Sequence, residues 1–213
     1  MKTPAALSFA ALSLAALTAA SEGRAQGFTN VDWLVLQPEV GVSWANVASF
    51  SNSNLFPEVN TSSETGPRYG AFVGMRFGPV SFGGHFDFAR YTPYDIGTVG
   101  VMGELRLPSP LIQPWARLGI GYAWLGDVNL ASNAFRCSPG STATECPSIN
   151  GWNLGLGAGV DFALIKYVTV GAGVDFTLLN LTRSASPTAT GFSQTGDSVG
   201  FQLSLMARAA LRF

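Results

Sequence analysis

Apolar and polar residues alternate along at least eight segments of this sequence, and this period of two constrains the fold more than any other feature. The stretch SVGFQLSLMARAALRF shows it most plainly, because every second residue from Phe201 to Phe213 is apolar. Side chains of a strand point alternately to two faces, so each such segment predicts a strand with one apolar face. The predicted strands are residues 33–45, 68–77, 80–91, 98–107, 113–124, 152–163, 168–179 and 198–213.

The connections between these segments alternate between long and short. A long polar loop follows the first segment, whereas Gly78 and Pro79 alone follow the second, and residues 125–151 follow the fifth whereas 164–166 follow the sixth. Short periplasmic turns and longer extracellular loops are typical of outer-membrane barrels. Most segments also have the roughly 9 to 11 residues that a tilted strand needs to cross a bilayer. An even number of strands then places both ends of the barrel on the periplasmic side.

The composition is compatible with a membrane protein that crosses as strands. Of the 213 residues, 47% are hydrophobic and 12% charged, whereas about a quarter are charged in an ordinary soluble domain. Beyond the N-terminal region, no run approaches the ~20 apolar residues that a membrane helix needs. The formal net charge of -1 provides no basic surface for nucleic acid, so that class of partner is excluded.

The first 25 residues have the pattern of a secretory signal peptide. Lys2 precedes an apolar run from Ala5 to Ala20, and Gly23 and Ala25 stand at the spacing of a cleavage site. We expect cleavage after Ala25, which leaves residues 26–213 as the barrel domain. An N-terminal membrane anchor is the alternative, but the Ala-rich run is too short and no stop-transfer flank follows it.

The two faces of the predicted strands differ in a way that favours a barrel in lipid. One face is apolar, while the other consists mostly of glycine with scattered charges. A glycine-rich face in water would make a poor strand, whereas glycine fits the crowded interior of a narrow barrel. Aromatic residues such as Trp44 and Tyr122 at one end and Phe77 and Tyr167 at the other predict two interfacial girdles. A soluble sandwich or lipocalin-like barrel is the alternative.

Taken together, these features and the final Phe213 resemble the small outer-membrane β-barrel proteins of Gram-negative bacteria, of the OmpA transmembrane domain, OmpX/Ail and OmpW types. The resemblance implies an all-β fold, an eight-stranded antiparallel up-and-down transmembrane barrel. It implies a monomer surrounded by outer-membrane lipids and lipopolysaccharide, with a possible extracellular ligand at the loops. It also implies that Phe213 belongs to the signal read by the barrel-assembly machinery. No motif selects a subfamily.

Charged residues on the inward face are balanced, which predicts a charge network that fills the lumen. Buried charges persist when they are paired, and the interior of eight strands is just wide enough for side chains. Glu104 and Arg117 are expected near one depth, and so are Glu39 and Arg208. A proton or ion path through these groups is the alternative. The predicted network comprises Glu39, Asp87, Glu104, Asp161, Asp175, Arg76, Arg106, Arg117, Arg208 and Arg212.

His85 and Asp87 are weak candidates for catalysis. Both face the lumen, so Asp87 has the position to orient the imidazole. No serine follows in the spacing of the lipid A deacylases, and the expected neighbours on the adjacent strand are Phe72 and Gly70. A structural histidine is therefore favoured over a general base, which needs a nucleophile to activate.

Cys137 and Cys146 lie in a loop rich in Ser, Thr, Pro and Gly. Export brings them to an oxidising compartment, so we predict one local disulfide. A metal site would need further ligands, and the single histidine is distant in sequence. Neither a metal nor a cofactor is expected.

The hexapeptide GAGVDF occurs at 157–162 and again at 171–176. A dinucleotide-binding loop would continue into a helix, and none is predicted, so we interpret the copies as neighbouring strands whose glycines face the lumen. A three-residue turn at 164–166 would place Asp161 opposite Thr169 and Asp175 opposite Gly155.

The sequence thus predicts a non-enzymatic outer-membrane barrel with a filled polar lumen and a structural or surface-interaction role through its loops. Transport of small hydrophobic molecules, as implied by the OmpW type, and a lipid-modifying enzyme that uses His85 are the alternatives.

Overall fold

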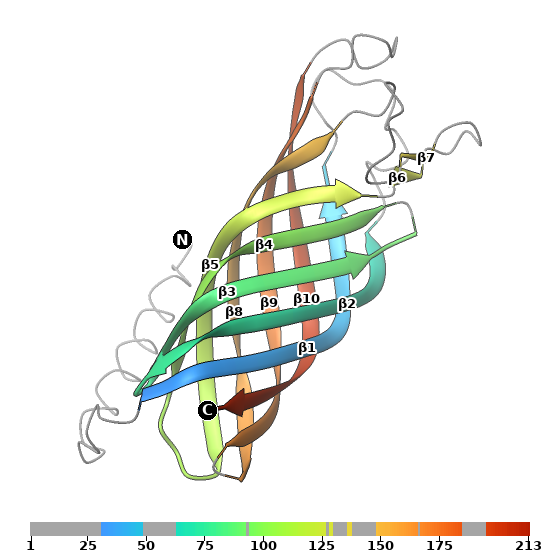
Figure 1. The fold of residues 1–213 in the computed structure, drawn as a ribbon. Helices are drawn as coiled ribbons and strands as arrows, with labels where there is room; N and C mark the ends of the chain where they lie inside the picture. The colour runs from blue at the N-terminus through green and yellow to red at the C-terminus, as the bar shows by residue number, and fades with distance from the viewer. Residues whose placement is uncertain are drawn as a thin grey trace, which may run out of the picture.

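Eight antiparallel strands close into a barrel in the computed structural model (Figure 1). The structure describes residues 31–48, 63–92, 94–126, 128–129, 136–137, 148–165, 167–184 and 195–213. The barrel strands are β1 (Val31–Val47), β2 (Glu64–Phe77), β3 (Val80–Arg90), β4 (Asp95–Arg106), β5 (Ile112–Gly126), β8 (Ile149–Ile165), β9 (Val168–Arg183) and β10 (Gly196–Arg212). Two short strands, β6 (Val128–Asn129) and β7 (Arg136–Cys137), pair with each other. The predicted fold class is confirmed.

Each barrel strand pairs with its neighbour along the chain, and β1 pairs with β10 to close the ring. Beyond β10, the amide of Phe213 donates to the carbonyl of Leu34 at 2.9 Å, and Leu34 donates back at 3.3 Å. Gly78, with a φ of 58°, forms the turn between β2 and β3, a conformation that glycine adopts at little cost. We call the end with this turn the short-turn end and the opposite one the long-loop end. No helix in the described part of the chain is long and apolar enough to cross a membrane.

The strands extend further toward the long-loop end than the sequence predicts. Strand β2 begins at Glu64 and not at Arg68, and β9 continues to Arg183. Gly66 and Pro67 were interpreted as loop, because glycine and proline are depleted in strands. The structure pairs both with β1 in regular register.

The barrel is apolar outside and polar inside. Along β10 exposure alternates residue by residue, so that Phe201 and Leu205 are exposed while Gln202, Ser204 and Arg208 are buried. This arrangement is the reverse of a soluble domain and corresponds to a barrel surrounded by lipid. The alternative of a soluble sandwich is excluded by it.

The lumen is polar in its middle and apolar at the long-loop end. Tyr91 and Tyr94 pack there with their ring centroids 5.3 Å apart. Burial raises the pKa of the Tyr94 phenol. Leu179 and Leu181 belong to the same group because the alternation of β9 continues beyond its predicted end. This apolar cap consists of Ala45, Val47, Ala89, Tyr91, Tyr94, Ile96, Ala123, Ile149, Leu179 and Leu181.

The pairing of β8 with β9 differs from the expected register by two residues. Asp161 lies opposite Gly171 and Asp175 opposite Gly157. A register shift between Ala163 and Ile165 lets Ile165 pair with Val168. The two strands therefore remain paired closer to the turn than a three-residue connection would allow. The two aspartates are therefore closer along the barrel than the sequence suggested.

Candidate functional site in the barrel lumen

Two clusters of buried charges occupy the middle of the lumen. The loop-side cluster consists of Glu39, Arg68, His85, Asp87, Arg117 and Asp175. The turn-side cluster consists of Glu104, Arg106, Asp161 and Arg208. Their members come from all eight barrel strands, so the clusters tie the walls of the barrel together.

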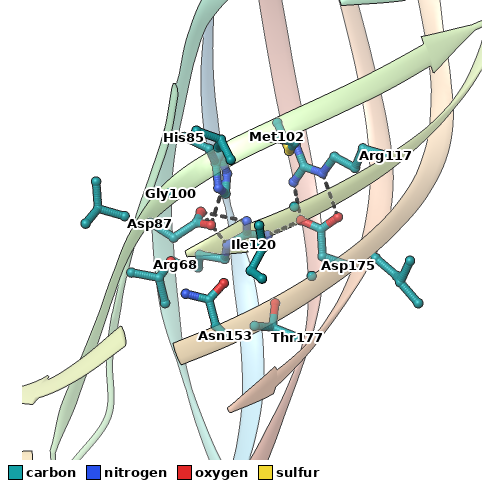
Figure 2. A pocket seen from close by; sticks show the side chains of 16 residues that line it. Arg68, His85, Asp87, Gly100, Met102, Arg117, Ile120, Asn153, Asp175 and Thr177 are labelled. Carbon is teal, nitrogen blue, oxygen red and sulfur yellow. Dashed lines mark hydrogen bonds and ion pairs between the residues drawn. The ribbon is translucent and has the colours of Figure 1, made fainter. Parts of the chain in front are cut away.

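Two arginines join three carboxylates in the loop-side cluster, as Figure 2 shows in part. Arg117 donates from Nη2 to Glu39 Oε2 at 2.9 Å and from Nε to Asp175 Oδ1 at 2.9 Å. Arg68 donates from Nη1 to the other Asp175 oxygen at 2.7 Å, and its Nη2 lies 2.6 Å from Asp87 Oδ1. Each carboxylate is thus paired, as a buried charge requires.

The predicted network does not include Arg68, although Arg68 shares the inward face of β2 with Arg76. It was placed at the edge of the predicted strand, where an exposed side chain is common. Because β2 in fact starts at Glu64, Arg68 lies inside the barrel and is buried. Continuation of the alternation through Gly66 was the signal available in the sequence.

In the turn-side cluster, Arg208 forms a two-pronged contact with Asp161, from Nε to Oδ1 at 2.8 Å and from Nη2 to Oδ2 at 2.9 Å. Its third nitrogen reaches Glu104 at 2.5 Å. Arg106 lies 2.8 Å from Glu104 and 2.9 Å from Asp161, which closes a ring of two acids and two bases. The Trp115 ring covers Arg208, whose guanidinium carbon lies 3.6 Å from the ring centroid, a cation–π contact.

The GAGVDF repeat explains how charges two strands apart reach each other. Gly157 stands between Arg117 on β5 and Asp175 on β9, and Gly171 stands between Asp161 on β8 and Arg208 on β10. A Cβ at Gly157 would lie 1.9 Å from Asp175 Oδ1, and one at Gly171 would lie 2.1 Å from Asp161 Oδ1. Each ion pair therefore passes over a glycine, and antiparallel pairing puts the first glycine of each copy beside the aspartate of the other.

The expected depths agree with the register, but the contacts differ from it. Glu104 is opposite Arg117 and Glu39 is opposite Arg208 in the strand pairing. The side chains exchange partners, however, since Arg117 contacts Glu39 and Arg208 contacts Glu104. Barrel strands are tilted, so residues in register on successive strands drift along the barrel axis.

Arg76 and Arg212 lie outside both clusters and have partners of a different kind. Arg76 donates from Nε to the carbonyl of Gly78 at 2.7 Å. Arg212 donates from Nη2 to Gln113 at 3.2 Å and to Thr169 at 3.4 Å. Neither forms an ion pair with any residue that the structure describes.

His85 belongs to the loop-side cluster and borders a small cavity (Figure 2). Its Nε2 lies 3.0 Å from Asp87 Oδ2 and 3.9 Å from Glu39 Oε2. The cavity measures about 30 Å³, enough for a water molecule. Thr98, Asn153 and Thr177 supply polar groups on its wall, which Gly100, Gly119 and Gly155 also line.

Glu39, His85 and Asp87 also place three ligand-type atoms within 4.8 Å of one another. Both carboxylates are already neutralised by Arg68 and Arg117. Two guanidinium groups at this distance oppose a divalent cation by direct repulsion. The arrangement fits an ion-pair network better than a metal site.

No protein-family model and no curated protein sequence matches the chain. Among solved structures, Neisserial surface protein A is similar with a TM-score of 0.51 and 13% identity, over 86% of this chain and 99% of that one. The outer-membrane protein AlkL has a TM-score of 0.49 and 10% identity, over 87% and 93%. The N-terminal barrel of Pseudomonas aeruginosa OprF has 0.44 and 10%, over 83% and 99%.

The chain has the fold of the small outer-membrane β-barrels. At this level of identity the similarity establishes the fold alone, and no subfamily is singled out. The OmpA, OmpX/Ail and OmpW types share this fold, so the resemblance in the sequence is confirmed at the level of architecture.

Some predicted features of this outer-membrane barrel fold remain predictions. The signal peptide at 1–25 and Cys146 fall outside the described residues, so the Cys137–Cys146 disulfide does too. Phe213 is described, and its ring is 65% exposed at the short-turn end. That position is compatible with the girdle of aromatic residues expected there.

Proposed function

We propose that the protein is a non-enzymatic outer-membrane barrel, exported with a signal peptide, whose filled lumen makes a rigid support for the loops at the long-loop end. The single observation that carries this proposal is the way in which the lumen is filled. Two charge clusters and the apolar cap follow one another along the axis. Side chains that brace opposite walls resist deformation, and a rigid scaffold suits loops that meet ligands at the cell surface.

The surroundings of His85 support a structural role over catalysis. Both close contacts of its Nε2 are carboxylate oxygens, from Asp87 and Glu39. A general base needs a hydroxyl or water to deprotonate, held within hydrogen-bond reach of a free nitrogen. The imidazole Nε2 instead faces the same acids that bind Arg68 and Arg117.

The apolar exterior supports outer-membrane lipids and lipopolysaccharide as the surroundings of this barrel. Side chains such as Val101 and Leu118 are more than half exposed on the outer face, and exposure of this extent is unfavourable in water. The proposal also includes a monomeric state and recognition of Phe213 by the barrel-assembly machinery. A ligand of the extracellular loops is its least defined part.

Lipid profiling tests the non-enzymatic part of this proposal. A Gram-negative strain that lacks the gene would produce either the wild type or His85→Gln, and lipid A and phospholipids would be compared by mass spectrometry. We expect the two lipid profiles to be identical, with both proteins in the outer-membrane fraction and cut only in the long loops by protease added to intact cells. An acylation change that disappears with His85→Gln would identify an enzyme. Recovery of detergent-free protein from the periplasm would contradict the membrane location.

A further inference from the structure

The short-turn end of the lumen carries arginines in excess of acids. The turn-side cluster is balanced, with two acids and two bases. Arg76 and Arg212 lie nearby and add two positive charges. Asp32 is an electrostatic neighbour of both, but in the described ranges no salt bridge joins it to either arginine. With Asp32 counted, the described side chains at this end are four arginines against three acids, so one positive charge is not offset.

Three buried donors without an acceptor also lie at this end. Arg106 Nη1, Arg212 Nε and Trp115 Nε1 are buried and have no hydrogen-bond partner among the described residues. These three residues are 2%, 8% and 3% exposed. Buried donors are nearly always satisfied in folded proteins, by protein, water or a bound ion. An acceptor from outside the chain is thus expected here.

The contacts of these residues show that they converge on one part of the wall. Arg106 reaches Asp161, which lies opposite Gln113 on the neighbouring strand, and Arg212 donates to Gln113 itself. Trp115 is the next inward residue after Gln113 on β5. Arg106 is also an electrostatic neighbour of both Arg76 and Arg212.

The geometry points to an oxyanion site at the short-turn end of the lumen, in which a phosphate group accepts hydrogen bonds from Arg106 and Arg212 and is neutralised by Arg212 and Arg76. Guanidinium groups match the oxygens of phosphate in shape and charge. A water molecule would satisfy a donor but would not offset the excess positive charge. Arg76 is only partly buried, so it provides access from the aqueous side. Free phosphate and the phosphate of a lipid headgroup share this chemistry.

The test uses the folded full barrel in octyl glucoside, a detergent without phosphate. Inorganic phosphate would be titrated by calorimetry at constant ionic strength, with chloride as the balancing anion, and short-chain phosphatidylglycerol in the micelle would be the second probe. The decisive variant is Arg76→Gln/Arg212→Gln, which leaves the turn-side cluster intact. Arg90→Gln is the matched control, because it removes an exposed positive charge at the opposite end.

We expect saturable phosphate binding by the wild type and by Arg90→Gln, and a loss of affinity of about tenfold or more in the double variant, as the loss of charged hydrogen bonds predicts. Saturation by phosphatidylglycerol alone would support the site with a lipid as its source. Equal affinity in the double variant, or no saturation with either probe beyond the effect of chloride, would show that water fills the site. If the double variant does not fold, Arg76→Gln alone provides the same comparison.

Discussion

At the scale of single residues, the lumen depends on a few arginines that each hold two acids. Arg117 binds Glu39 on β1 and Asp175 on β9, and its aliphatic part passes over Gly157. Charge alone does not produce this effect, since Arg76 is also an inward arginine but binds a carbonyl oxygen. The contribution of each arginine to the stability of the barrel therefore depends on the acids within its reach.

The substitution Arg117→Leu tests this dependence. It leaves Glu39 and Asp175 with fewer partners, and not Glu104, which the strand register places opposite Arg117. Removing one partner of a buried ion pair typically costs ~3–5 kcal/mol, and we expect a loss of this size in the free energy of unfolding. Urea titration of the barrel in lipid vesicles, followed by its gel mobility, measures that loss. The control is Arg76→Leu, which removes no ion pair, and an equal loss in both variants would contradict the assignment.

At the scale of strands, β8 and β9 show how a short repeat specifies a pairing. The two GAGVDF copies match only when glycine lies opposite aspartate, because a larger residue there would collide with the carboxylate. A one-residue slip would also turn the apolar face into the lumen. The repeat thus fixes both the register and the ion pairs that cross it.

Gly171→Ala should destabilise the barrel, whereas Gly84→Ala should not. A Cβ at Gly171 would meet Asp161 Oδ1 at 2.1 Å and the Val160 carbonyl oxygen at 2.4 Å, while at Gly84 the nearest atom would be 4.0 Å away. Overpacking of this kind costs about 1–3 kcal/mol, and a substitution into open space changes stability by about 0.5 kcal/mol or less. Unfolding by urea in the same vesicles compares the two variants. A similar loss in both would show that glycine is needed for strand flexibility in general.

How much of this arrangement the sequence predicts depends on whether the information is local. Alternation and loop lengths are local, so the strands and the inward position of Glu39, Asp161 or Arg208 could be derived from them. Partners across the lumen depend on strand tilt, which no single segment contains. The bulge near Ala163 is likewise a property of the paired strands, and Arg68 was lost because glycine and proline obscured the start of β2.

At the scale of the whole molecule, three successive barriers oppose the passage of ions. The apolar cap lies at the long-loop end, and the loop-side and turn-side clusters follow toward the short turns. A continuous water path would have to separate buried ion pairs and also hydrate the cap. The diameter of the barrel alone does not exclude a pore, but the side chains that fill the lumen do.

In planar bilayers, purified protein should therefore show at most small and rare openings. The variant Tyr94→Ala/Leu181→Ala, which thins the apolar cap, should behave in the same way, because both charge clusters remain below it. Single-channel recording measures the difference. Steady currents of porin size from the wild type would refute a filled lumen, and steady currents from the cap variant alone would show that the cap is the real barrier.

The seam between β1 and β10 has a consequence for the kinetics of folding. Strands from the two ends of the domain form it, down to the bonds between Leu34 and Phe213. Loop closure over such a separation is entropically costly and slow. Until it happens, two strand edges lack partners, and in lipid each unpaired backbone group is strongly unfavourable. Insertion into the membrane should thus be cooperative. The lifetime of the unclosed intermediate should be set by how long the edges of β1 and β10 remain unpaired. A catalyst that shields these edges would accelerate assembly without altering the final state.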